Sequence, residues 1–252
     1  MSKPGVYVVA AGGTGGHLFP AQAFAKTMLA RGHRVVLMTD KRFLAYKDGF
    51  GDVEVQTVAS GKLNGSLFQK LMGVEQIALG VAQAGWQLLK LKPQAVIGFG
   101  GYPSFPTMLA ALLHGMPTVL HEQNRLMGKT NRVLANRMTA IAASFNDMRG
   151  FAPGSAQKMV VTGNPVLPAI AALREQPYTP PAEGNIDLLV FGGSQGAHVF
   201  SEVLPQALQT LPDALRQRLV ITQQCRKEDV DHTQAAYQAL GIRATVAPFF
   251  KD

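Results

Sequence analysis

The feature that most constrains the fold of this chain is an alternation between short β-branched segments and longer segments of helical periodicity. Seven strands are predicted in the first part of the chain, at 6–10, 34–38, 53–58, 95–98, 118–121, 140–143 and 158–161. Predicted helices, such as 20–31, 67–91 and 128–137, lie between most of them. This alternation predicts an α/β fold, in which helices cover both faces of a parallel sheet.

A proline-rich break separates this series from a shorter one. Residues 174–185 hold three prolines and show no apolar periodicity, so we place a linker at 164–185. The pattern restarts with strands at 187–191, 218–222 and 243–247 and helices at 197–211 and 227–240. We therefore expect one complete doubly wound domain at 1–163 and a second domain at 186–252. A doubly wound domain usually has about five or six strands, so the second is expected to be incomplete.

The charge of the chain is unevenly distributed. Residues 1–160 hold 17 Lys+Arg and 7 Asp+Glu (+10), whereas residues 161–252 hold 7 and 9 (−2). A basic surface favours nucleic acid, an anionic membrane surface or a phosphorylated substrate as partner. The single cysteine, Cys225, excludes a disulfide scaffold and a cysteine-based metal site. We expect neither a signal peptide nor a membrane span, which needs roughly 18–20 apolar residues.

A glycine-rich turn follows the first predicted strand of each domain. Residues 12–16 read Gly-Gly-Thr-Gly-Gly, and residues 192–196 read Gly-Gly-Ser-Gln-Gly. Glycine admits a ligand close to the backbone, and the following helix offers unpaired N–H groups, so both turns predict phosphate or diphosphate sites. The alternative is a tight turn that needs glycine for packing. An NAD-dependent oxidoreductase is a further alternative: Leu18 replaces the third glycine of its fingerprint, although Asp40 could bind a ribose.

Polar residues cluster where predicted strands of the first domain end. His17 follows the first glycine-rich turn, Tyr102 follows the fourth strand, and Glu122 and Asn124 follow the fifth. Ligands of open α/β sheets bind at the carboxyl ends of strands, so these four residues could meet in one pocket and perform acid–base chemistry. The alternative for each is a structural, hydrogen-bonded role.

The predicted helix at 67–91 carries two apolar stripes. The first comprises Leu67, Leu71, Val74, Ala78, Val81 and Leu88, and the second comprises Phe68, Met72, Leu79 and Trp86. We expect the first stripe to face the core. The second is either buried as well or forms an exposed patch that enters a membrane interface, with Trp86 as an anchor and lysines nearby.

Five motifs in a fixed order resemble the MurG family, the peripheral bacterial glycosyltransferases of peptidoglycan synthesis. They are Gly-Gly-Thr-Gly-Gly-His-Leu-Phe-Pro at 12–20, Gly-Gly-Tyr at 100–102, His-Glu-Gln-Asn at 121–124, Gly-Asn-Pro-Val at 163–166 and the turn at 192–196. The resemblance implies a GT-B fold, which has two Rossmann-like domains with the active site between them. It also implies inverting transfer of N-acetylglucosamine from UDP-N-acetylglucosamine to the C4 hydroxyl of undecaprenyl-diphosphate-linked N-acetylmuramyl-pentapeptide (lipid I), which yields lipid II.

The resemblance also implies partners and site residues. The first domain would bind lipid I and the anionic cytoplasmic face of the inner membrane, and the second would bind the UDP-sugar, without a cofactor, a metal or nucleic acid. His17 and Glu122 would be catalytic, with His17 as the base, and Tyr102 and Gln123 would lie on the acceptor side. The UDP-N-acetylglucosamine contacts would be Thr14, Gly15, Gly16, Asn124, Ser194 and Gln195.

The sequence departs from the family pattern in three ways, one of which is Thr-Gln-Gln-Cys-Arg at 222–226, where the family commonly has His-Gln-Ser-Gly. Leu167 stands where the family usually has an arginine after Gly-Asn-Pro-Val, so a cation expected to meet the nucleotide is missing. The chain also ends before the later motifs of the second domain, and we expect a C-terminally truncated member. A non-catalytic remnant that keeps acceptor and membrane binding is therefore the alternative function.

Overall fold

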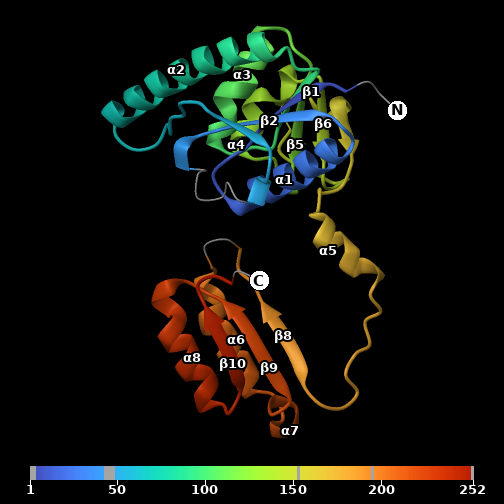
Figure 1. Cartoon of the computed structure of the whole chain (residues 1–252). Helices are drawn as coiled ribbons and strands as arrows, with labels where there is room; N and C mark the ends of the chain where they lie inside the picture. The colour runs from blue at the N-terminus through green and yellow to red at the C-terminus, as the bar shows by residue number, and fades with distance from the viewer. Residues whose placement is uncertain (1–3, 43–48, 152–153, 194–195, 251–252) are drawn as a thin grey trace. The chain divides into compact units, whose positions relative to one another are not determined.

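The computed structural model describes residues 4–42, 49–151, 154–193 and 196–250. The chain divides into two compact units, Met1–Arg174 and Glu175–Asp252, and the division lies within the segment predicted as a linker. Each unit is built on an all-parallel sheet with helices packed against it, as Figure 1 shows. The predicted α/β class is confirmed in both units.

The sheet of the first unit has seven parallel strands in the order β3-β2-β1-β4-β5-β6-β7. Their bounds are β1 Val6–Ala10, β2 Arg34–Thr39, β3 Glu54–Thr57, β4 Ala95–Gly98, β5 Thr118–Glu122, β6 Ala140–Ala143 and β7 Met159–Val161. All seven predicted strands are present, with ends that differ by two residues at most. The order reverses between β1 and β4, and this reversal is the switch point at which open α/β sheets bind ligands.

Two apolar layers cover the two faces of this sheet. The helices of the unit are α1 Gly15–Ala30, α2 Leu67–Leu91, α3 Phe105–Leu113, α4 Lys129–Leu134 and α5 Pro168–Ala172. Val8 of β1 packs in the layer that holds Leu88 of α2 and Met108 of α3. Its neighbour Val9 packs in the opposite layer with Leu18 of α1. Successive strand residues point to opposite faces, so each central strand contributes to both layers.

Helix α2 has the predicted bounds, and its ends are explained by local chemistry. Ser66 and Gln69 form a reciprocal capping box at its start, in which Gln69 N donates to the Ser66 hydroxyl and Ser66 N donates to the Gln69 amide oxygen. The helix ends at Leu91, and its C-cap residue Lys92 has a left-handed φ of +46° directly before Pro93. In contrast, α1 begins five residues before the predicted start at Pro20 and runs through that proline.

The packing of α2 differs from the expectation drawn from its stripes. Leu67 and Leu71 are 75% and 61% exposed, so the prediction that the first stripe faces the core is wrong for the N-terminal half of the helix. Glycines make the contact instead. A Cβ on Gly80 would collide with the carbonyl oxygen of Ala59 and come within 3.0 Å of Pro106. Close backbone approach thus replaces side-chain packing along this part of α2.

The second stripe of α2 is exposed too, and this excludes a helix buried on two sides. We call the exposed set Leu67, Phe68, Leu71, Met72, Leu79 and Trp86 the α2 apolar face. The ammonium group of Lys90 lies 3.4 Å from the centroid of the Trp86 ring. Among the helices that the structure describes, none has the length and apolar character needed to cross a membrane.

The second unit has a three-stranded parallel sheet in the order β10-β9-β8 among its described residues. Its elements are β8 Ile186–Val190, α6 His198–Gln209, α7 Asp213–Arg216, β9 Leu219–Gln224, α8 Val230–Ala239 and β10 Arg243–Ala247. Ile221 of β9 and Tyr237 of α8 lie at the centre of its core and are fully buried. Burial raises the pKa of Tyr237 to about 12. The three strands predicted for this part of the chain are therefore confirmed.

Candidate functional site

The turn after β1 packs directly against the turn after β4, and glycines on both sides make this possible. A Cβ on Gly12 would lie 2.7 Å from the Pro103 ring, and a Cβ on Gly101 would collide with the carbonyl oxygen of Gly12. Gly13 has a φ of +94°, and Thr14 is the N-cap of α1, although its side chain does not make a capping hydrogen bond. The exposed N-terminus of α1 therefore presents N–H groups and a positive dipole end beside the switch point.

His17 lies in the first turn of α1 and is held by two oxygen acceptors. Its Nδ1 is 2.9 Å from the carbonyl oxygen of Phe99 and 3.3 Å from Oε1 of Gln123. Because both partners only accept, Nδ1 carries a proton, and in the neutral ring Nε2 holds the lone pair. Gly100 leaves room for the ring, since a Cβ there would come within 3.1 Å of His17 Nδ1. The half-buried imidazole is thus fixed in the form that can accept a proton at Nε2.

A chain of hydrogen bonds connects His17 to the end of β7. The Nε2 group of Gln123 donates to the Phe99 carbonyl at 2.9 Å and lies 3.1 Å from Nδ1 of His121. Nε2 of His121 in turn lies 3.1 Å from the carbonyl oxygen of Gly163. Burial lowers the pKa of His121, although the Gly163 carbonyl and Glu122 oppose this shift. His121 and Gly163 were not among the predicted site residues, and only their place within the motifs could have pointed to them.

Glu122 is buried and its carboxylate is fully occupied. Oε1 accepts hydrogen bonds from the backbone N and from Nδ2 of Asn124, both at 3.0 Å. Oε2 accepts from the backbone N of Gly128 and from Nδ2 of Asn131, both at 2.9 Å. The carboxylate therefore joins the end of β5 to Asn124 and to the start of α4. Asn131, which the sequence reading did not single out, also donates to the carbonyl oxygen of His121.

Tyr102 belongs to a different cluster of side chains. Its hydroxyl donates to Oδ2 of Asp40 at 3.2 Å. The guanidinium carbon of Arg42 and the ammonium of Lys62 lie 4.9 Å and 5.2 Å from the centroid of its ring. Burial raises the pKa of the Tyr102 hydroxyl, and the Asp40 charge adds to this shift. Of the predicted site residues, His17 therefore contacts Gln123, and Glu122 contacts Asn124. The hydroxyl of Tyr102 instead bonds to Asp40, at the end of β2.

The glycine-rich turn of the second unit precedes α6. A Cβ on Gly196 would lie 2.7 Å from the backbone N of Arg226, so this turn also needs a close backbone approach. Ser194 and Gln195 lie outside the described residues. His198, at the first position of α6, bonds through Nδ1 to both Asp229 carboxylate oxygens at 2.9 Å. The hydrogen bond to Asp229 raises the pKa of His198.

The pocket nearest to the Gly-Asn-Pro-Val motif is apolar. It has a volume of about 390 Å³ and is lined by Phe19 and Pro20 of α1 and by Asn164, Pro165, Val166, Leu167 and Ile170. Leu167 therefore presents an apolar side chain where the family pattern has a cation. Within the described ranges, no group of three or more His, Cys, Asp or Glu side chains is placed to hold a metal ion.

Comparisons with known proteins match both units to domains of one glycosyltransferase family. The model of the glycosyltransferase family 28 N-terminal domain matches residues 7–143, and that of the C-terminal domain matches residues 187–252. A relative from Rhodospirillum centenum is 49% identical over 97% of this chain. It is named UDP-N-acetylglucosamine–N-acetylmuramyl-(pentapeptide) pyrophosphoryl-undecaprenol N-acetylglucosamine transferase. A relative of the same name from Paramagnetospirillum magneticum is 48% identical over 99% of this chain.

Solved structures agree with this assignment. The crystal structure of Acinetobacter baumannii MurG matches 99% of this chain and 69% of its own, with 32% identity and a TM-score of 0.70. The UDP-N-acetylglucosamine 2-epimerase of Neisseria meningitidis shares the fold at 14% identity and a TM-score of 0.62, over 97% of this chain and 72% of its own. The chain spans 65% and 68% of the lengths of the two curated relatives. It has the GT-B fold and belongs to glycosyltransferase family 28, within the MurG family of transferases.

Proposed function

We propose that this chain carries the acceptor-side machinery of an inverting transferase. The reaction moves N-acetylglucosamine from UDP-N-acetylglucosamine to the C4 hydroxyl of undecaprenyl-diphosphate-linked N-acetylmuramyl-pentapeptide. The names of the relatives support this reaction, and one observation in the structure carries it. Nδ1 of His17 is held by two acceptors, so its Nε2 can accept a proton. Since the chain spans about two thirds of the length of its relatives, the reaction is to be measured on this chain itself.

His17 is the proposed base. Its Nε2 takes the proton of the C4 hydroxyl as that oxygen attacks the anomeric carbon from the face opposite UDP. The bond between the anomeric carbon and the phosphate oxygen breaks, and its electron pair leaves with UDP. The imidazolium that forms keeps its Nδ1–H bonds to Phe99 O and Gln123 Oε1, which stabilise the new positive charge.

The remaining predicted site residues take supporting roles in this proposal. Thr14, Gly15 and Gly16 place the N-terminus of α1 where it can stabilise diphosphate charge. Asn124, Ser194 and Gln195 are assigned to the UDP-sugar, and Tyr102 and Gln123 to the acceptor side. Glu122 was predicted to be catalytic, but four donors already occupy its carboxylate, so we assign it as a positioning residue for Asn124 and α4.

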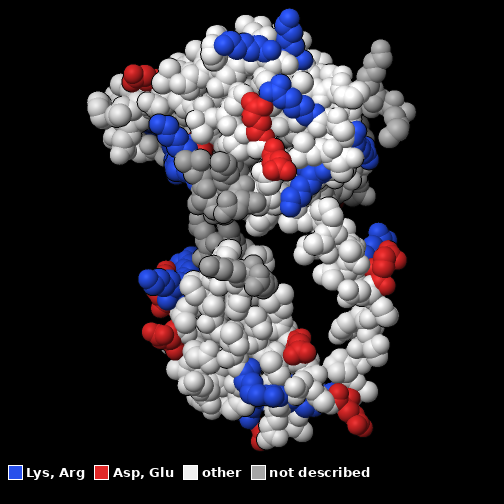
Figure 2. All heavy atoms as spheres, in the orientation of Figure 1, with Lys and Arg blue, Asp and Glu red and all other residues white. Residues whose placement is uncertain are grey.

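The same proposal includes peripheral contact with an anionic membrane. The α2 apolar face exposes six large side chains, and the ammonium of Lys90 lies over the Trp86 ring. Lys70 lies within the same helix and Lys92 directly follows it. Figure 2 shows Lys and Arg side chains spread over the visible surface of the first unit. An exposed apolar helix face bordered by cations is the pattern of a helix that lies in a membrane interface. The cytoplasmic face of the inner membrane is the surface on which UDP-sugars and a lipid-linked acceptor meet.

A transfer assay tests the proposed reaction. The 252-residue chain is incubated with labelled UDP-N-acetylglucosamine and a lipid I analogue, and the labelled lipid product is measured. We expect turnover, with His17→Ala lowering the rate about 10²–10⁴-fold. The matched control is His232→Ala, at an exposed histidine of the second unit. A wild-type rate in His17→Ala would move the base elsewhere. No product, together with retained acceptor binding, would leave the non-catalytic remnant as the function.

A further inference from the structure

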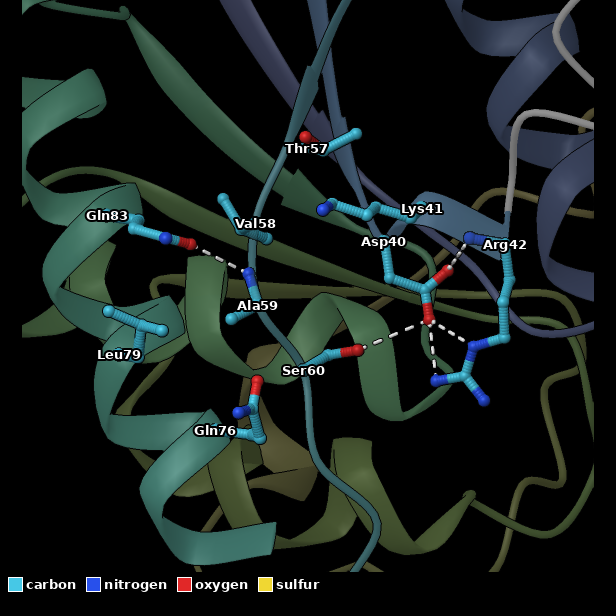
Figure 3. Close-up of a pocket in the computed structure, with 10 residues that line it drawn as sticks. All are labelled: Asp40, Lys41, Arg42, Thr57, Val58, Ala59, Ser60, Gln76, Leu79 and Gln83. Carbon is cyan, nitrogen blue, oxygen red and sulfur yellow. Dashed lines mark hydrogen bonds and ion pairs between the residues drawn. The ribbon is translucent and has the colours of Figure 1, made fainter. Parts of the chain in front are cut away.

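A recess of about 370 Å³ opens in the first unit beside the edge strand β3, apart from the hydrogen-bonded chain of His17. Three segments line it, as Figure 3 shows: residues 40–42 after β2, residues 57–60 that continue β3, and the side of α2 that carries Gln76, Leu79 and Gln83. Its volume falls within the range of about 300–1,000 Å³ that is typical of small-molecule sites.

The single carboxylate in the lining is already neutralised. Oδ2 of Asp40 accepts from Nε of Arg42 at 3.0 Å and lies 2.9 Å from Nη2 of the same residue. Ser60 Oγ also donates to this oxygen, at 3.3 Å, and Figure 3 shows the carboxylate between Ser60 and Arg42. The Asp40 side chain is only 9% exposed, so these contacts take up most of its accessible surface.

The remaining charge around the recess is positive. Lys41 is exposed and lines the recess, and it has no acidic partner among the residues whose placement is described. Lys62 adds a second cation at the Tyr102 ring, next to Asp40. With Asp40 paired to Arg42, Lys41 and Lys62 leave an excess of two positive charges. The recess therefore favours a ligand that carries carboxylate or phosphate.

Amide groups make up much of the rest of the lining. Gln83 accepts a hydrogen bond from the backbone N of Ala59 at 2.8 Å through Oε1, which leaves its Nε2 group to donate. Gln76 is exposed on the same side of α2, and it has no hydrogen bond within the part of the chain that the structure describes. Residues 57–60 continue the outermost strand of the sheet, where backbone groups can bond to an extended peptide.

We propose that this recess binds the peptide of the acceptor, with its carboxylate at Lys41 and its amides at Gln76, Gln83 and the backbone of residues 57–60. This rests on the proposed function, which supplies a muramyl-pentapeptide as substrate. A peptide matches both the cations and the amides of the lining, whereas a bare diphosphate would use only the cations. Tyr102 connects the recess to the base, because its hydroxyl donates to the lining residue Asp40 and it directly follows Gly100 and Gly101, which pack against His17.

Binding of two soluble probes tests this assignment. Calorimetry on the whole chain compares N-acetylmuramyl-pentapeptide with the N-methylamide of N-acetylmuramic acid, which lacks the peptide. Lys41→Glu is expected to weaken binding of the pentapeptide about fivefold to tenfold, since it replaces an attraction with a repulsion of similar size. Gln76→Ala is expected to weaken it about threefold through one lost hydrogen bond. Neither variant should change binding of the peptide-free probe.

The control variant is Lys26→Glu, which makes the same charge change at an exposed residue of α1. Pentapeptide binding in this control should stay within about twofold of wild type. Equal losses for both probes, or no loss in Lys41→Glu, would overturn the inference. Inorganic pyrophosphate is the third probe: if its binding falls in Lys41→Glu while pentapeptide binding does not, the recess is a diphosphate site and the inference is wrong.

The transfer assay separates failure of this inference from failure of the proposed function. If product forms but Lys41→Glu changes neither pentapeptide binding nor the KM for the acceptor, the inference fails and the transferase stands. If no product forms but pentapeptide binding depends on Lys41, the transferase fails and the peptide site stands.

Discussion

Glu122→Gln is the change that most directly tests how the site is built. The carboxylate of Glu122 receives one backbone N–H on each oxygen, from Asn124 on Oε1 and from Gly128 on Oε2. A glutamine has one oxygen and one NH₂ group in the same positions. Side-chain amides can rotate to suit a new partner, but backbone N–H groups are fixed. Whichever way the substituted side chain turns, its NH₂ group faces one of the two backbone donors.

The size of the effect follows from these contacts. A hydrogen bond to a charged group contributes about 1.5–3 kcal/mol, and at least one such bond is lost, with two donors left in opposition. Removal of a buried charge offsets part of this cost. We therefore expect the free energy of unfolding of the first unit to fall by at least about 2 kcal/mol, against a typical total of about 5–15 kcal/mol.

Hydrogen–deuterium exchange with mass spectrometry is the suitable assay because it resolves the first unit from the second. Peptides from β5 should exchange about 30-fold faster in Glu122→Gln, which corresponds to about 2 kcal/mol. The control is Glu75→Gln, at an exposed position of α2. Exchange of β5 within about threefold of wild type would refute the view that the Glu122 carboxylate fixes this end of the sheet.

The remaining predictions concern α2 and α6. Gly80→Ala should destabilise the first unit and detach α2, because the new Cβ meets the Ala59 carbonyl, and increased exchange of α2 amides would show this. Trp86→Glu should weaken binding to anionic vesicles in a sedimentation assay without loss of helical circular dichroism, and unfolding instead would contradict an exposed role. The hydrogen bond to Asp229 raises the pKa of His198, so protonated His198 stabilises the second unit at pH values below the ordinary histidine pKa. That stability should be lost as pH rises through the raised value, and urea titrations of wild type and His198→Gln should converge at high pH.

The sequence predicted the fold well where the signal was local. Most strands of the two sheets are short apolar runs rich in Val and Ile, most are separated by helical segments, and such a run has few other stable structures open to it. The bounds of α2 were predictable because Ser66 and Gln69 cap one end and Pro93 follows the other. The start of α1 was not, because Pro20 is a common first-turn residue and the glycines before it have low helix propensity.

The orientation of α2 and the partners within the site could not be predicted from the sequence, because they depend on contacts between distant segments. The apolar stripe at Leu67 and Leu71 has the periodicity of a buried face. Gly73 and Gly80 bury a different side by backbone contact, which no hydrophobic pattern records. Likewise, Tyr102 and Glu122 both lie at the carboxyl ends of strands of the same sheet, but the hydroxyl of Tyr102 bonds to Asp40 at the end of β2.

The hydrogen-bonded chain behind His17 requires a single protonation state. Gln123 can offer Oε1 to His17 only while its NH₂ group points to Phe99 O and to Nδ1 of His121. Nδ1 of His121 accepts that bond only when the ring is neutral, with its proton on Nε2 and directed at the Gly163 carbonyl. Burial lowers the pKa of His121 and so favours this form. Protonation of His121 would place two donors face to face at Gln123, and rotation of the Gln123 amide in response would remove one of the two acceptors that hold Nδ1 of His17, leaving the carbonyl oxygen of Phe99.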